Sequence, residues 1–576
     1  TMAKRTVEGD FFFRNPTGRF GVFTDDDDGG NFLVGDMTPN DGMTCDGGID
    51  FGGTGVVNNP IGVNDPDVVT RMQAVFADPN CFSFLEFFPG GYTPRFGADV
   101  EDFYGSAGIR GELASGLTYD FSATAGSSRI GFFASNVPNP SMGSLSPTVF
   151  PRVGDQIMAE KFVNADFAYP VAIQGFESPL NVAFGLAWQD EDFEILAGEQ
   201  ASFQAGVLAN QGFLIGEEAI PGFSPLISGE FGRHNVAAYV DLEADITRAL
   251  TLGAAVRTED FSDDTGSETT YKVSGMFRFT DDLAFRATYS TGFHAPTIGQ
   301  TRFSTTTTEF DDNGNLLESG QIPPTSPTAL AVGAMPLRPE TSDSITAGIV
   351  FETDKLTLTL DTYYIEVDDR VTLSASQSLT DQQRQELIDQ GFQAAAGIGS
   401  FRFFTNDFAT ETKGVDLIAT MPLDLFSGGD TELALAFNYT KTEVTSFDPN
   451  DPNELLDAVR IAQIEKNYPE TRGNITLRHT RDRWRSHVRV NHYGSFTEMH
   501  VNGNLPINAS STLTVDAEFA LNVTDKIELA VGADNLLGEE PMRNPWDFIV
   551  GSKFPTTQPN GLDNGLWYLR ARYSFE

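Results

Sequence analysis

The chain has 576 residues and a formal net charge of −44, from 81 acidic and 37 basic side chains. Because phosphate binding needs a basic face, this balance excludes nucleic acid as an expected partner. The 48 Phe and 56 Gly residues are typical of aromatic-banded strands with many turns. No apolar run approaches the roughly 18–20 residues of a membrane helix, although a barrel hides its membrane character by alternating.

The N-terminal segment, residues 1–13, resembles the tail of a strand, and no signal peptide opens the chain. We therefore expect the sequence to be a fragment of a longer secreted protein. A long Gly/Asp/Pro-rich loop follows over about residues 14–95 and contains both cysteines, Cys45 and Cys81. In an oxidising compartment we expect them to form a disulfide that closes this loop, the alternative being two unlinked small apolar residues.

Period-two alternation recurs at regular intervals after this loop. One row of each segment is apolar, and the opposite row carries charges such as Asp120, Asp241 and Arg278. Isolated buried charges are costly, so the polar rows need a wet interior, while the long apolar rows need an oily exterior. A wall between lipid and a polar lumen satisfies both. The segments include Leu117–Ala125, Ala238–Ile246, Leu250–Val256, Tyr271–Phe279, Leu433–Tyr439, Leu513–Leu521 and Ile527–Ala533.

Connection lengths alternate between short and long, as tight periplasmic turns and extracellular loops do in a membrane barrel. One upper link, near Asp263–Ser267, is short and breaks the regularity. Within one long loop, Thr380 as N-cap, Gln383 three positions later and Gly391 beyond the end predict a helix. The predicted long loops are residues 14–95, 135–153, 194–232, 294–341, 369–404, 446–468, 495–510 and 538–565.

The last segment, residues 566–576, is the most informative. Trp567, Leu569, Tyr573 and Phe575 share one face of an extended strand, and charged residues line the other. The chain is therefore predicted to be all-β. We expect one antiparallel transmembrane β-barrel over residues 1–576 with about 18 strands, the first of them partial.

Four segments resemble motifs of the TonB-dependent outer-membrane receptors. Residues 289–297 (YSTGFHAPT) are similar to the family's S-x-G-F-R-A-P segment, and residues 337–341 (LRPET) to its L-x-P-E-x-S segment. Residues 413–417 (KGVDL) and 534–541 (DNLLGEEP) resemble two later motifs, and Tyr573-Ser574-Phe575 resembles the aromatic signal read by the barrel-assembly machinery. His294 departs from the family's Arg, which puts an ion pair at that corner in doubt.

The resemblance implies a barrel of 22 strands with an N-terminal plug and an energy-coupling box. Neither plug nor box is recognisable here, so we expect about four strands and the plug to be missing. The implied function is TonB-dependent uptake of a scarce nutrient, with siderophore, haem, cobalamin and oligosaccharide classes all open. The alternative is a passive porin-like channel. The expected partners are outer-membrane lipid and lipopolysaccharide, the TonB complex acting through the missing plug, and a small-molecule nutrient, with the barrel a monomer in the bacterial outer membrane.

Residue types single out a few candidates for ligand contact. These are Phe84, Phe87 and Tyr92 of the first long loop, together with His294 and His500. The alternative for the loop aromatics is that they pack on one another, and solvation is the default for the acidic run at residues 25–30, which does not fit EF-hand spacing. The six histidines show no metal-ligand spacing, and no nucleophile elbow, H-E-x-x-H or phosphate-binding Gly loop is present. We expect no enzyme activity, no metal and no cofactor.

Overall fold

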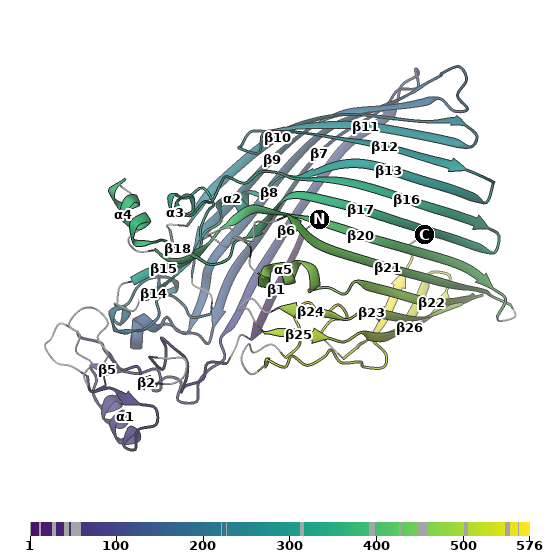
Figure 1. The fold of residues 1–576 in the computed structure, drawn as a ribbon. Coiled ribbons are helices and arrows are strands. Elements are labelled where there is room, and N and C mark those ends of the chain that lie inside the picture. The colour runs from purple at the N-terminus through teal and green to yellow at the C-terminus, as the bar shows by residue number, and fades with distance from the viewer. Residues whose placement is uncertain are drawn as a thin grey trace.

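In the computed structural model, the chain forms one large antiparallel sheet that curves into a barrel, with loops and short helices gathered at one end (Figure 1). The predicted fold class is confirmed. The structure describes residues 2–10, 13–25, 30–39, 45–47, 59–219, 222–225, 227–310, 316–390, 398–425, 428–446, 456, 458–499, 505–547, 553–562 and 564–575.

The sheet contains 18 strands, which matches the predicted count. They are β1 (Met2–Asp10), β6 (Arg95–Glu112), β7 (Thr118–Ser135), β8 (Val149–Val171), β9 (Leu180–Ala197), β10 (Gly229–Thr247), β11 (Leu250–Phe261), β12 (Ser267–Arg278), β13 (Leu283–His294), β16 (Glu340–Thr353), β17 (Leu356–Leu373), β20 (Phe404–Leu423), β21 (Asp430–Ser446), β22 (Thr471–Arg481), β23 (Trp484–Tyr493), β26 (Thr512–Thr524), β27 (Ile527–Asp534) and β28 (Leu566–Tyr573).

Shorter elements lie in the long connections. The helices are α1 (Val68–Ala77), α2 (Ile298–Arg302), α3 (Pro327–Ala331), α4 (Asp381–Asp389) and α5 (Ala458–Lys466), with 3-10 turns η1 (Pro140–Leu145), η2 (Gln200–Ser202) and η3 (Ala209–Gln211). The short strands are β2 (Asn31–Phe32), β3 (Gly35–Asp36), β4 (Ile61–Gly62), β5 (Cys81–Phe82), β14 (Thr305–Phe310), β15 (Leu316–Gln321), β18 (Gln377–Ser378), β19 (Ile398–Arg402), β24 (Phe496–Met499) and β25 (Pro506–Ala509).

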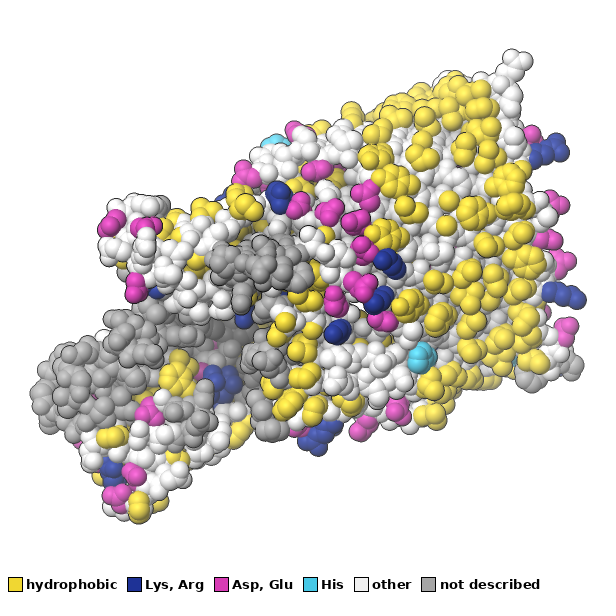
Figure 2. All heavy atoms as spheres, viewed as in Figure 1, with side chains coloured by type: hydrophobic (Ala, Val, Ile, Leu, Met, Phe, Trp, Pro, Cys, Tyr) yellow, Lys and Arg dark blue, Asp and Glu magenta, His cyan; other side chains and the backbone are white. Residues whose placement is uncertain are grey.

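The barrel strands form a meander. Strand β1 pairs with β6, and each barrel strand from β6 onward pairs antiparallel with the next one in sequence, up to β27 with β28. The register places Leu435 opposite Ala419 and Ile475, so apolar residues continue from strand to strand on one face. Figure 2 shows this apolar band on the outside of the barrel, where many of its large side chains are exposed.

Connections at the two rims differ as predicted. Tight turns such as those of residues 113–117, 279–282 and 354–355 join strands at one rim, and the long loops lie at the other. Three loops are clearly shorter than predicted, at residues 136–148, 198–228 and 374–403. At the first and third, the predicted boundaries were wrong because register shifts let β8 pair with β7, and β17 with β20, beyond points where the alternation breaks. At the second, β9 and β10 pair up to Ile195 and Gly229, further toward the loop than predicted.

The long-loop rim has small hydrophobic cores of its own. The largest contains Val22, Phe23, Phe82, Phe84 and Phe213, so it joins the loop before β6 to the loop between β9 and β10. The helix predicted from Thr380 is α4, and its capping box with Gln383 is present, while Gly391 lies outside the described residues. Among the described residues, no helix is long and apolar enough to span a membrane.

Candidate functional site

The first loop and the β9–β10 loop meet through a buried polar cluster, which we call the loop clamp: Arg14, Arg19, Tyr92 and Glu218. The Glu218 carboxylate is fully buried and accepts hydrogen bonds from Arg14 Nε at 2.6 Å and Arg19 Nε at 2.7 Å. The Tyr92 hydroxyl donates to Glu218 Oε2 at 3.2 Å, and burial together with this carboxylate raises the pKa of Tyr92 well above its ordinary value. The clamp therefore fixes one loop against the other at the mouth of the barrel.

The aromatic candidates of the first loop differ in accessibility. Phe84 is fully buried, with ring contacts to Phe82 and Phe213, and Tyr92 belongs to the loop clamp. Phe87 remains 40% exposed, at the edge of the same aromatic group. Packing therefore accounts for Phe84 and Tyr92, and Phe87 stays the ligand-contact candidate of this group.

The same loop contains a disulfide module, formed by β2 to β5 and α1. Cys45 and Cys81 are joined in a disulfide, with their Cα atoms 5.6 Å apart. Arg71 of α1 contacts Asp46, whose pKa it lowers through a hydrogen bond. The disulfide and the ion pair therefore hold the described parts of this module together around its own small hydrophobic core.

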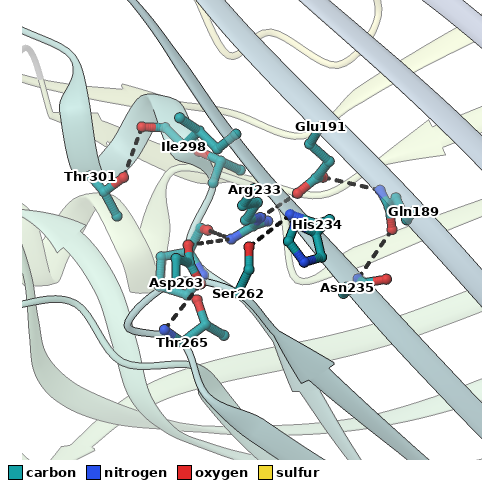
Figure 3. A network of polar contacts seen from close by, with 12 residues as sticks. Gln189, Glu191, Arg233, His234, Asn235, Ser262, Asp263, Thr265, Ile298 and Thr301 are labelled. Atoms are coloured by element: carbon teal, nitrogen blue, oxygen red, sulfur yellow. Dashed lines mark hydrogen bonds and ion pairs between the residues drawn. The ribbon is translucent and has the colours of Figure 1, made fainter.

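A second polar network lies at the top of β9, β10 and β11, centred on Arg233 (Figure 3). The Arg233 guanidinium is almost fully buried, pairs with Glu191, lies 3.6 Å from Asp263 Oδ2, and donates from Nη1 to the Pro296 carbonyl oxygen at 2.7 Å. Pro296 belongs to the motif at residues 289–297. Arg233 therefore fixes the corner where that motif leaves β13 and enters its large loop.

A cavity of about 150 Å³ adjoins this network. Asp263, Asp264 and Arg302 supply charged groups to its lining, and Ile298 and Leu337 supply apolar ones. Its walls come from the short β11–β12 link and the long loop after β13, so a small polar group could sit where two connections meet.

The two histidine candidates fare differently. His294 is exposed at the end of β13, and its Nδ1 lies 3.8 Å from the Glu340 carboxylate across the β13–β16 ladder. Protonated His294 would therefore form the ion pair that the missing Arg put in doubt. His500 lies outside the described residues. His487 and His492 lie on opposite faces of β23, as their spacing predicted.

The inner wall is lined by ion pairs and hydrogen bonds. Arg286 donates to both oxygens of Asp361, at 2.9 and 2.6 Å, and Glu518 accepts from Arg485 and Arg570. A cavity of about 620 Å³ near the tight-turn rim is lined by Arg110, Asp120 and Asp166, among others. The predicted charged row thus lines the lumen. Within the described ranges, no group of three His, Cys, Asp or Glu residues is placed to hold a metal ion.

Comparison with known protein families shows to which family this barrel belongs. The family model for the β-barrel of TonB-dependent receptor-like proteins matches residues 13–536. The chain belongs to this family. This membership confirms the resemblance read from the motifs. Comparison with curated protein sequences gives no match.

Solved structures show the same fold for TonB-dependent receptor barrels. The siderophore receptor PirA from Acinetobacter baumannii aligns with a TM-score of 0.53 at 14% identity, covering 87% of this chain and 65% of that one. A mutant of the ferric enterobactin receptor PfeA from Pseudomonas aeruginosa gives 0.56 at 13% identity, covering 84% and 67%. The copper transporter OprC gives 0.51 at 13% identity, covering 84% and 66%. The chain thus spans about two thirds of the length of these proteins.

Sequence reasoning did not single out Arg233, Glu191 or Glu218. Glu191 and Glu218 are two of 81 acidic residues, so their residue type carried no signal. A weak signal did exist, since Arg14 and Arg19 are rare cations in an acidic loop. Their partner lies about 200 residues away, and only the folded mouth brings the groups together.

Proposed function

We propose that this chain is the barrel of an outer-membrane receptor that takes up a scarce nutrient by TonB-dependent, energy-coupled transport. The observation that carries the proposal is the family match over residues 13–536, on a wall with an apolar outside (Figure 2) and a charged lumen. Such a wall suits a bilayer, because lipid-facing and lumen-facing residues alternate along each strand. The proposal includes location in the bacterial outer membrane and no catalytic activity.

The mouth supports capture of a ligand from the outside. The loop clamp joins the first loop to the β9–β10 loop, the disulfide closes part of the first loop, and the Arg233 network joins β10 to the corner after β13. A preorganised mouth loses less conformational entropy when a ligand binds. Phe87 and His294 are the exposed side chains that we propose as ligand contacts. His500, which lies outside the described residues, stays a candidate from the sequence alone.

The nutrient is proposed to be a small complex, within the siderophore, haem, cobalamin or oligosaccharide classes. The names of the structural neighbours include a siderophore receptor and a copper transporter, so iron- and copper-bearing complexes are the first cargoes to test. The coupling partner is proposed to be the TonB complex, which acts through a plug in this family.

The test uses the full-length gene product in its outer membrane. Uptake of radiolabelled iron or copper complexes is measured with the TonB system intact and with it deleted, alongside single-channel conductance in planar bilayers. Uptake that disappears without TonB, and no open-channel conductance, is the expected result. Large steady conductance with TonB-independent uptake would establish the passive channel instead and overturn the proposal.

A further inference from the structure

The cavity beside the Arg233 network, which we call the corner cavity, lies where two connections of the long-loop rim meet. Its volume is about 150 Å³. One wall is the short β11–β12 link, residues 262–266, which breaks the regular alternation of short and long connections. Another wall comes from the long loop between β13 and β16. The short link therefore has a place in the mouth that its length alone did not explain.

Both charged sides of the corner cavity are held by local structure. Arg302 lies in the last turn of α2, and a capping box between Thr297 and Gln300 fixes the start of that helix. On the other side, Asp263 Oδ1 accepts a hydrogen bond from the Thr265 N–H at 3.1 Å. Figure 3 shows Asp263 and Thr265 beside the segment that carries Ile298 and Thr301. The cavity therefore has its charged groups in place before any ligand enters.

The charges of the corner cavity are not all matched by one another. Arg233 Nη1 lies 3.6 Å from Asp263 Oδ2 and so compensates one carboxylate. Asp264 and Arg302 are exposed, and within the part of the chain that the structure describes they form no ion pair with each other or with a third residue. Two opposite charges that line one cavity without touching leave room for a ligand between them. A ligand with both charges satisfies both groups, and charge-assisted hydrogen bonds are the strong ones.

The size of the corner cavity sets the size of that ligand. In another protein, a cavity of roughly 150 Å³ holds benzene, a molecule of about six non-hydrogen atoms. Sites for drug-sized ligands are larger, at roughly 300–1,000 Å³. Ile298 and Leu337 give the cavity an apolar wall. The Thr301 hydroxyl donates to the Ile298 carbonyl oxygen at 2.9 Å, so its own lone pairs remain to accept from an ammonium group.

We propose that the corner cavity binds a small zwitterionic amino acid. The carboxylate pairs with Arg302, the ammonium group lies beside Asp263 and Asp264, and the short side chain lies against Ile298 and Leu337. Siderophores, haem, cobalamin and oligosaccharides are all larger than such a molecule, so this site is separate from that of the proposed nutrient. The inference goes beyond the proposed uptake and does not depend on it.

The test is equilibrium dialysis of radiolabelled L-alanine against the purified full-length protein in detergent at pH 7. L-Lactate and L-alaninamide are the competitors, because each has about the size of L-alanine and lacks one of its two charges. We expect each competitor to bind about fivefold or more weakly than L-alanine, since each leaves one charged group of the cavity without its partner. L-Tryptophan, which is too large for the cavity, should not compete.

Two single variants separate the two ends of the ligand. Arg302→Gln should lose the preference for L-alanine over L-alaninamide and keep the preference over L-lactate. Asp264→Asn should keep the first preference and lower the second about twofold or more, because Asp263 remains. Both residues are exposed, so neither change should unfold the protein. A cavity residue with a merely structural role would not change the two preferences in opposite ways.

The matched controls are Arg543→Gln in the last long loop and Asp525→Asn in a tight turn, whose side chains are 74% and 99% exposed. Both should keep the wild-type preferences. Absence of saturable L-alanine binding, or unchanged preferences in both cavity variants, would overturn the inference. Equal competition by L-alaninamide would assign the cavity to a simple cation, equal competition by L-lactate would assign it to a simple anion, and either result overturns the inference. Uptake measurements test the proposed function separately, since the dialysis needs no transport.

Discussion

Removal of the Glu218 charge tests the loop clamp most directly. In Glu218→Gln, the Arg14 guanidinium, which is 6% exposed, keeps its charge but loses the Glu218 carboxylate. Breaking a buried ion pair from one side costs about 3–5 kcal/mol. We expect the contact between the two loops to open roughly 100- to 5,000-fold more often, since each 1.4 kcal/mol is tenfold.

Hydrogen exchange at the Leu214 amide of the β9–β10 loop reports this opening. The Leu214 N–H donates to the carbonyl oxygen of Gly21 in the first loop at 2.9 Å, and this hydrogen bond protects the amide only while the two loops are in contact. The control is Glu177→Gln, which removes the carboxylate of the exposed pair with Arg248 and should leave exchange at Leu214 unchanged. Exchange at Leu214 that rises less than about tenfold in Glu218→Gln would refute the reasoning.

Three further predictions concern the wall and the first loop. Leu435→Arg should reduce the yield of folded, heat-modifiable barrel far more than Asn438→Arg, because a lipid-facing Arg at mid-bilayer costs about 2–4 kcal/mol, and equal yields would contradict the assignment of faces. Non-reducing peptide mapping should recover one joined fragment containing Cys45 and Cys81, and two alkylatable thiols would contradict the link. The Tyr92 phenol should ionise later than the exposed tyrosines in an ultraviolet pH titration, because its pKa is raised; its contribution to stability is complete below pH 10.0 and declines as the pH rises toward its folded-state pKa. Loss of that late step in Tyr92→Phe identifies it, and an unchanged titration curve would contradict the prediction.

The two faces of the barrel strands could be predicted from the sequence, because lipid-facing and lumen-facing side chains alternate with a period of two residues. The rows at Leu433–Tyr439 and Leu513–Leu521 each lie on one face, as the alternation indicated. The capping box of Thr380 was also predictable, since both partners are three residues apart. Local patterns thus suffice where the interaction itself is local or periodic.

The ends of strands and the mouth could not be predicted in the same way. β8 begins at Val149 although its first residues do not alternate, because pairing with β7 resumes after a register shift. Buried contacts between loops depend on which loops meet, and sequence spacing carries no information about that. The aromatic residues of the first loop show the same limit, since Phe84 is buried and Phe87 is exposed a few positions apart.

The meander has a consequence for how the protein reaches its final form. Nearly every barrel strand finds its partner in the neighbouring segment of chain, so hairpins can be added one after another with small loop-closure entropy. The first loop is the exception, since its polar contacts need a partner 204 residues further on. The contact between the first loop and the β9–β10 loop can therefore form only after β9 and β10 have paired. A barrel whose insertion stops before that point would have paired strands but no ordered contact between these two loops.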